Sequence, residues 1–291
     1  MIGGVRPWTC LRGTKGTTLI EIMVTLVILS IVMTAVFSTF LSQQQSYTVQ
    51  NAAAEVQQNV RGGMQFMERD IRNAGSGLAG LPSTVAVTLP AAMTGSGAVT
   101  MNYGLGVLDG GANGADNVYV IFVIPDATTL AATMAGVTSP LNVVNATGWT
   151  VGDMGIVFNS TNADVFQVAA VTDTNLTHIL FGNANLSIAY AAGDTVGRIY
   201  YAGYFIDNTT NSVRPTLSQR SVGGVGTLTS QVVADDIEDL QARLILDNTS
   251  EGDRNDAIIT GNLARIRQVR VYLSGRTAGR DKSWSEPGGA D

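Results

Sequence analysis

The chain has 291 residues, of which 45% are hydrophobic and only 14% are charged, which allows an anchor helix and one or two compact domains. Its net charge of −6 argues against nucleic acid as a partner, because phosphate binding needs a basic face. The single cysteine, Cys10, cannot form a disulfide within the chain, so stability must come from the core.

A basic segment begins the chain and an apolar segment follows it. The first sixteen residues carry Arg6, Arg12 and Lys15 and no acidic residue, and the apolar run reaches Leu41. Positive charge beside a membrane span stays on the cytoplasmic side, which predicts a cytoplasmic N-terminus. Glu21 stands at the start of the apolar run, where burying a carboxylate in hydrocarbon costs about 3 kcal/mol or more. It is therefore a candidate functional residue that needs a partner.

The run from Lys15 to Glu21 resembles the class III leader of type IV prepilins and type II secretion pseudopilins. In that family a membrane-embedded peptidase cuts after a glycine, and the new N-terminus is methylated. The resemblance implies cleavage between Gly16 and Thr17, and N-methylation of Thr17, where the family usually has Phe or Met. It also implies that Glu21, the fifth mature residue, docks subunits by neutralising the free amine of a neighbour. An uncleaved single-pass anchor is the alternative.

One long helix is expected after the leader. No proline occurs between Pro7 and Pro82, so the helix can run from Thr18 to Asn73, roughly 80 Å. Beyond Leu41 the pattern becomes amphipathic and predicts a stripe that packs on a globular domain. The stripe consists of Val49, Ala53, Val56, Val60, Met64, Met67 and Ile71.

Two further stretches carry a narrower resemblance. From Met67 to Gly75 an acid-Arg-acid run leads into Ala-Gly, as in PilW-like minor pilins and the pseudopilin J group. Within it, Glu68 and Arg72 could also form a simple surface ion pair. The stretches from Val233 to Leu240 and from Ile266 to Leu273 resemble the last strands of PilW-like proteins. The alternation of apolar residues between Leu240 and Leu246, and again from Val269 to Leu273, predicts two half-buried strands.

The sequence after Gly80 consists of short β-rich runs separated by Gly, Asn, Asp and Thr. Buried strands are expected at 118–124 and 199–206. Between them, residues 137–198 predict a small barrel-like insertion, because Gly152-Asp153 and Gly193-Asp194 each lead into a strand candidate. The strand candidates inside it are 142–144, 154–158, 165–171 and 177–181.

These elements predict an α+β fold. A long N-terminal helix, with a transmembrane half and an amphipathic half, packs on an antiparallel β-sheet that carries a small all-β barrel-like insertion. The predicted divisions are a cleaved leader 1–16, a transmembrane and assembly helix 17–41, its amphipathic continuation 42–75, the first part of a pilin globular domain 76–136, the insertion 137–198, the last pilin strands 199–276 and a disordered tail 277–291.

The sequence offers little catalytic chemistry. His178, the only histidine, lies in a strand candidate and is interpreted as an ordinary strand residue. The glycine clusters at 104–106 and 223–226 lack the setting of a phosphate site and are interpreted as turns. The loop 247–253 resembles half of a calcium loop, but its twelfth place is Ile258 and not Glu. No enzyme activity, cofactor or metal is expected.

The resemblance implies a minor type IV pilin of the PilW-like kind, which helps to prime pilus assembly and enters the fibre near its tip. The implied partners are the prepilin peptidase, other minor and major pilins through the N-terminal helix, the inner-membrane assembly platform and membrane lipid. The implied location is the inner membrane, with a single span and a periplasmic domain, and then the pilus at the cell surface. The alternatives are a type II secretion pseudopilin of the J group and a membrane-tethered periplasmic binding or enzyme domain.

Overall fold

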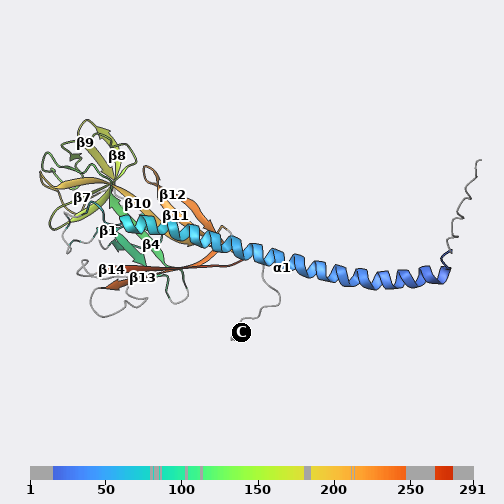
Figure 1. Cartoon of the computed structure of the whole chain (residues 1–291). Coiled ribbons are helices and arrows are strands. Elements are labelled where there is room, and N and C mark those ends of the chain that lie inside the picture. The colour runs from blue at the N-terminus through green and yellow to red at the C-terminus, as the bar shows by residue number, and fades with distance from the viewer. Residues whose placement is uncertain are drawn as a thin grey trace, which may run out of the picture. The chain divides into compact units, whose positions relative to one another are not determined.

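The computed structural model describes residues 16–78, 81, 85, 87–101, 104–111, 114–179, 185–210, 212, 214–246 and 266–277. The chain divides into two compact units, Met1–Ala52 and Ala53–Asp291. The predicted α+β class is confirmed, because one long helix, α1 (Leu19–Asn73), precedes antiparallel β-sheets (Figure 1).

The part of α1 in the second unit packs on the sheets along the predicted stripe. Val56 and Met67 are buried, and Gly63 lies so close to the sheet that a Cβ there would be 3.0 Å from a methyl group of Leu217. The stripe prediction is wrong for Val49, whose side chain is 60% exposed. Val49 lies in the first unit, whose described residues contain no strand for it to pack against.

The second unit is built from short and medium strands, and all strand pairs among the described residues are antiparallel. The elements are β1 (Val87–Leu89), α2 (Ala91–Thr94), β2 (Val99–Met101), β3 (Leu105–Leu108), β4 (Asn117–Val123), β5 (Thr128–Thr129), β6 (Leu141–Asn142), β7 (Met154–Phe158), β8 (Ala163–Thr172), β9 (Asn175–Ile179), β10 (Thr195–Asp207), β11 (Thr216–Gly224), β12 (Thr227–Asp235), β13 (Ile237–Leu246) and β14 (Ile266–Gly275). β1 pairs with β2, β13 pairs with β14, and the other strands form one sheet.

The thirteen-residue strand β10 lies at the centre of this sheet. Its first four residues, Thr195–Arg198, pair with β7. Its later residues pair with β4 on one side and with β11 on the other. A single strand therefore runs from the insertion into the rest of the domain, as Figure 1 shows.

Several predicted strands are observed at or near the expected positions. β7 matches 154–158, β4 and β10 cover most of 118–124 and all of 199–206, and the two C-terminal strands pair with each other as β13 and β14. Gly104 (φ 79°) and Gly226 (φ 68°) lie in turns, as expected. The interpretation as turn residues is wrong for Gly106, which lies in β3, and for Gly223 and Gly224, which end β11. A Cβ at Gly106 would be 2.6 Å from the sulfur of Met101.

The insertion has a hydrophobic core of its own. This core begins before the predicted start at residue 137, and its buried members are Leu130, Met134, Leu141, Val143, Trp149, Val157, Phe166, Val168, Leu176, Leu186, Tyr190 and Val196. Its strands follow the order β10-β7-β8-β9-β6, and the pairing returns toward β10 through a bridge between Leu130 and Val143 and through β5. Barrel closure stays a prediction, since that return path rests on one isolated bridge and a two-residue strand.

The two Gly-Asp turns of the insertion have the same geometry. Gly152 (φ 97°) and Gly193 (φ 91°) take left-handed backbone conformations that favour glycine. In each turn the following aspartate accepts a hydrogen bond from the backbone N–H three residues before it, at 2.7 Å for Asp153 and 2.8 Å for Asp194. These turns lead into β7 and β10, which pair with each other.

Gln167, a fully buried side chain on β8, joins the insertion to the β11–β12 turn. Its Nε2 donates to the carbonyl oxygens of Gly152 (3.0 Å) and Gly224 (2.7 Å), and its Oε1 accepts from the N–H of Gly226 (2.6 Å). Both donors and the oxygen of one buried amide thus form hydrogen bonds between two segments that are about 60 residues apart. The calcium-like loop 247–253 and residues 278–291 of the predicted tail lie outside the described residues.

Candidate processing and assembly segment

The start of α1 has the geometry of an N-capped helix. The carbonyl oxygen of Thr18 accepts bonds from the N–H groups of Glu21 (3.1 Å) and Ile22 (3.3 Å), so Thr18 is the cap residue. Glu21 lies in the first turn, where the helix dipole favours a negative charge, and Thr-x-x-Glu is the sequence of a capping box. The local sequence thus places one carboxylate at the N-terminal end of the helix.

Gly16 precedes the helix and has an open environment. A Cβ added there would meet no atom within 4 Å. No described residue packs against Gly16 in a way that requires a glycine, so any requirement for glycine there does not come from the described part of the fold. The predicted leader charges Arg6, Arg12 and Lys15 lie outside the described residues.

The apolar part of α1, from Leu19 to Leu41, is about 35 Å long at 1.5 Å per residue. The helix is long and apolar enough to cross a membrane, with a mean hydropathy of 2.6 in its most apolar window. Each of the five hydroxyl groups in this part donates to a backbone carbonyl of the same helix. They belong to Thr25, Ser30, Thr34, Ser38 and Thr39, at 2.7 to 2.9 Å. Its side-chain hydroxyls therefore need no partner from water, which suits a helix in hydrocarbon.

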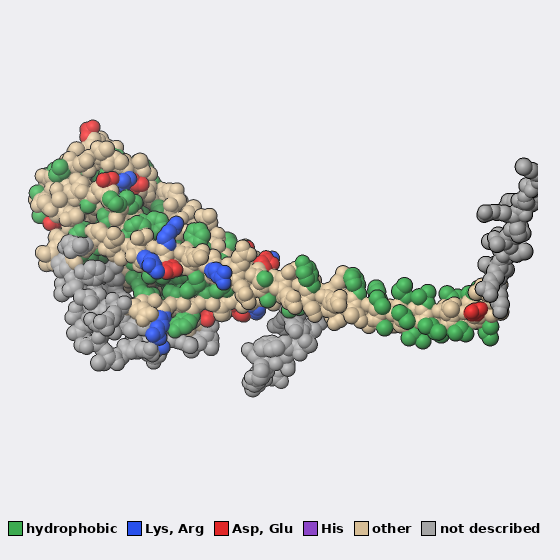
Figure 2. Space-filling view, in the orientation of Figure 1, with side chains coloured by type: hydrophobic (Ala, Val, Ile, Leu, Met, Phe, Trp, Pro, Cys, Tyr) green, Lys and Arg blue, Asp and Glu red, His purple; other side chains and the backbone are tan. Residues whose placement is uncertain are grey.

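Glu21 is the exception on this surface. It is exposed, and the sequence contains no other charged residue between Lys15 and Glu55. Figure 2 shows hydrophobic side chains along this part of the helix with an acidic group near its N-terminal end. The segment can offer a partner an apolar surface and a single negative charge.

Residues 11–37 match the family model described as the prokaryotic N-terminal methylation motif. The chain is type IV prepilin-like. The match spans Gly16, Thr17 and Glu21, and a class III leader of this kind implies processing by a prepilin peptidase and the use of pilin assembly machinery. Comparisons with curated proteins and with solved structures gave no match.

Asp70, near the C-terminal end of α1 in this prepilin-like chain, holds the helix on the sheet. Its side chain is buried, and its Oδ2 accepts from the hydroxyls of Tyr204 (2.7 Å) and Tyr200 (2.9 Å) and from Nε2 of Gln219 (3.3 Å). Arg69 donates from Nε to Oδ1 at 3.2 Å. Burial raises the pKa of both tyrosines, and the neighbouring carboxylate raises each pKa further, so both phenols remain donors.

The residue spacing along α1 contains a signal for the burial of Asp70. For the acid-Arg-acid run the sequence predicts a helix end like that of PilW-like proteins or a surface ion pair between Glu68 and Arg72, and these two residues do form an exposed ion pair. Asp70, however, follows the buried Gly63 and Met67 at seven and three residues, which places it on the same helix face. The spacing could have indicated burial, but the donors come from β10 and β11, more than 125 residues further along the chain.

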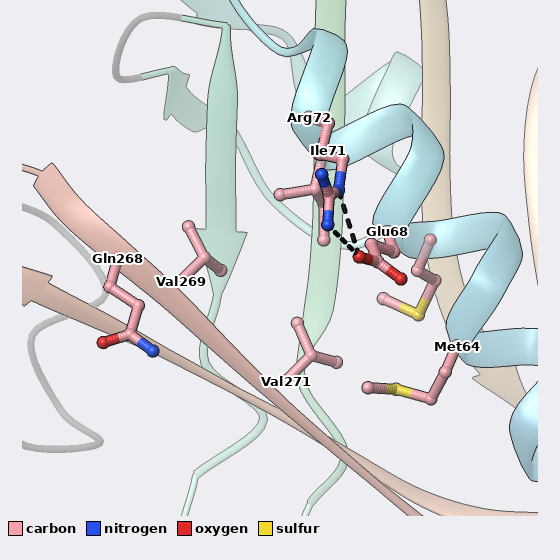
Figure 3. Close-up of a pocket in the computed structure, with 8 residues that line it drawn as sticks. Met64, Glu68, Ile71, Arg72, Gln268, Val269 and Val271 are labelled. Atoms are coloured by element: carbon pink, nitrogen blue, oxygen red, sulfur yellow. Dashed lines mark hydrogen bonds and ion pairs between the residues drawn. The ribbon is translucent and has the colours of Figure 1, made fainter.

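A groove separates the end of α1 from β14 (Figure 3). Its volume is about 450 Å³, and it is lined by Met64, Met67, Glu68, Ile71, Arg72, Gln268, Val269 and Val271. Figure 3 shows Met64 and Val271 on its two sides and the Glu68–Arg72 pair beside them. The C-terminal end of α1 and the strand β14, which both carry the resemblance to PilW-like proteins, therefore face each other in space.

Proposed function

We propose that this chain is a minor type IV pilin of the PilW-like kind. As such it is a structural subunit that helps to prime assembly of a pilus and is incorporated near the fibre tip. The observation that supports this most directly is the methylation motif at the head of an apolar helix that is exposed along its whole length from Leu19 to Leu41. The proposed role is structural and involves no catalytic residues.

The narrower assignment rests on the contact between the two stretches that resemble PilW-like proteins. Met67 and Ile71 of α1 belong to the same hydrophobic cluster as Val269, Val271 and Leu273 of β14. The strand from Ile237 to Leu246 is the hydrogen-bonded partner of β14. Residues that share a resemblance but lie about 200 positions apart thus form one packed unit, as a shared fold requires.

The proposed mechanism is an exchange of environments for the apolar helix. In the inner membrane this segment faces lipid, and in the fibre it faces the equally apolar helices of other subunits, so little hydrophobic free energy separates the two states. The charge of Glu21 then selects the docked state. A carboxylate and an amine about 4 Å apart attract each other far more strongly in a low-dielectric environment than in water. The amine is the new N-terminus that cleavage before Thr17 would create on a neighbouring subunit.

A deletion experiment separates this proposal from its alternatives. Loss of surface pili with normal protein secretion would support the minor pilin, whereas loss of secretion with normal pili would support the J-group pseudopilin. Recovery of the mature protein with an intact leader would favour a membrane-tethered periplasmic domain. The periplasmic side and the pilus location are part of the proposal and are tested by protease access in spheroplasts and by analysis of sheared fibres.

Replacing Gly16 by valine is expected to block processing. The wild-type chain should lose its first sixteen residues and begin at a methylated Thr17, whereas Gly16→Val should keep its full mass. Because a Cβ at Gly16 meets no atom within 4 Å, the change tests the peptidase and leaves folding unaffected. Mass spectrometry and N-terminal sequencing of membrane fractions make the measurement.

Gly62→Val is the matched control, because Gly62 also has no atom within 4 Å of an added Cβ. It should be processed normally. Complete processing of Gly16→Val, or recovery of Met1 from wild-type membranes that contain active peptidase, would contradict the assignment of the cleavage site.

A further inference from the structure

His178, the only histidine of the chain, is enclosed in the insertion. It lies on β9, its side chain is 6% exposed, and its ring meets the ring of Phe166 edge-on at 6.1 Å. Phe166 in turn stacks on Trp149, also at 6.1 Å. The imidazole therefore borders the hydrophobic core of the insertion.

One hydrogen bond of the ring defines the tautomer of the neutral imidazole. Nε2 lies 3.3 Å from the carbonyl oxygen of Val137, and a carbonyl can only accept, so Nε2 carries the proton. Nδ1 is buried and has no hydrogen-bond partner among the described residues. The same carbonyl of Val137 also accepts from the N–H of Leu186 at 3.1 Å. The neutral ring thus ties β9 to two covering segments, 131–140 and 185–194.

Few charges face the ring. Asp164 on β8 is the acidic group that acts on it, and the carboxylate of Asp164 is occupied by the N–H and hydroxyl of Ser187 and by the hydroxyl of Tyr190. Residues 131–140 and β9 itself contain no other residue that carries a charge near neutral pH. In the covering segment 185–194 the one charged residue is Asp194, whose carboxylate accepts from the N–H of Ala191 (2.8 Å) and from Asn159 (3.3 Å). Burial lowers the pKa of His178, and this outweighs the opposing effects of the Val137 carbonyl and of Asp164.

We propose that the insertion is an acid-sensitive element in which protonation of His178 at Nδ1 loosens the cover formed by residues 131–140 and 185–194. The new N–H would be a buried cationic donor that no described group accepts. It would lie beside the irregular part of the β8–β9 ladder, where the register shifts between Val168 and Ala170 and His178 pairs with Val168. Leu186 and Tyr190, which complete the core from the covering segment, would be released with it.

The direction of the pH effect follows from linkage. The pKa of His178 is lowered in the folded state from its ordinary value of 6.5. Below pH 6.5 the unfolded state therefore binds more protons than the folded state, and stability falls as the pH falls. The contribution of the neutral His178 ring to stability is fully present above pH 6.5. Between pH 7.5 and pH 5.0 the expected loss is at most about 30-fold in the local unfolding equilibrium, the limit for a histidine that stays neutral while folded.

Because the chain has one histidine, its titration can be observed directly. The experiment uses the full chain in detergent micelles with isotope-labelled histidine, and follows the ring resonances by NMR between pH 8 and pH 5. The expected midpoint lies below 6.5, with broadening or new signals as the cover loosens. A midpoint at or above 6.5 would overturn the proposal, and this measurement needs no variant that might fail to fold.

Amide hydrogen exchange provides a second test of the proposal. The protection factors of β8 and β9 amides should fall by up to about 30-fold from pH 7.5 to pH 5.0 in the wild type, whereas those of β13 and β14 should not respond to the histidine. His178→Gln, which can still donate to Val137 and cannot be protonated, should remove this difference. An equal acid response of β8 and β9 in the wild type and in His178→Gln would refute the role of His178.

Discussion

Glu21→Leu should be cleaved and stable in the inner membrane yet missing from sheared fibres. Removing the only charge of the apolar segment lowers the cost of membrane insertion by about 3 kcal/mol, so insertion should be normal or improved. Docking should fail, because the charge that we propose to neutralise a neighbouring amine is gone. Quantitative immunoblots of fibres and membranes give the ratio of this subunit to the major pilin.

Two control variants make this result specific. Glu21→Gln keeps the shape of the side chain and should fail as Glu21→Leu does. Glu55→Gln changes the next charged residue on the same helix, which is exposed and lies 3.7 Å from Arg214, and should enter fibres normally. If Glu21→Leu entered fibres at the normal ratio, Glu21 would not be the docking group. Entry would then depend on helix packing or on the second unit, Ala53–Asp291.

Asp70→Ala should destabilise the second unit by about 3 kcal/mol, because it leaves the buried hydroxyl groups of Tyr200 and Tyr204 without their acceptor. Gln219 also loses Asp70 as an acceptor, but its amide can still donate to the hydroxyl of Tyr200 at 2.9 Å and is not left unpaired. Urea denaturation of the full chain in detergent, followed by circular dichroism, should show a lower midpoint with an unchanged slope.

Glu68→Ala is the matched control for Asp70. It removes an exposed carboxylate two residues earlier and one surface ion pair, so it should change stability by only a few tenths of a kcal/mol. Equal midpoints for the two variants would contradict the view that Asp70 fastens the helix to the sheet.

Local patterns in the sequence were sufficient to predict the processing segment and the main helix. Gly16, Thr17 and Glu21 lie within six consecutive residues, and the absence of proline together with three- and four-residue spacing predicts α1 to within one residue. Strands with continuous apolar runs or clear alternation, such as β4 and β14, were predicted for the same reason.

The β11–β12 hairpin was missed because its strands show no such pattern. Most side chains of β12 are exposed, and Thr, Ser and Gln occupy much of it, so no apolar face marks it as a strand. The importance of Asp70 and Gln167 was also missed, since each satisfies groups that the fold brings from distant segments. The local sequence around a carboxylate does not show whether it is buried against tyrosine donors or faces solvent.

Because β10 is continuous, we expect the second unit to resist force best along the direction of this strand. Tension applied to the insertion along this strand would load its ladders with β4 and β11 in shear, so that many hydrogen bonds resist together, whereas a hairpin at a sheet edge opens one bond at a time. Tyr200 and Tyr204 lie on this same strand and hold Asp70 of α1. A pull on the insertion would therefore pass through two phenol–carboxylate hydrogen bonds into α1, the helix that we propose as the anchor.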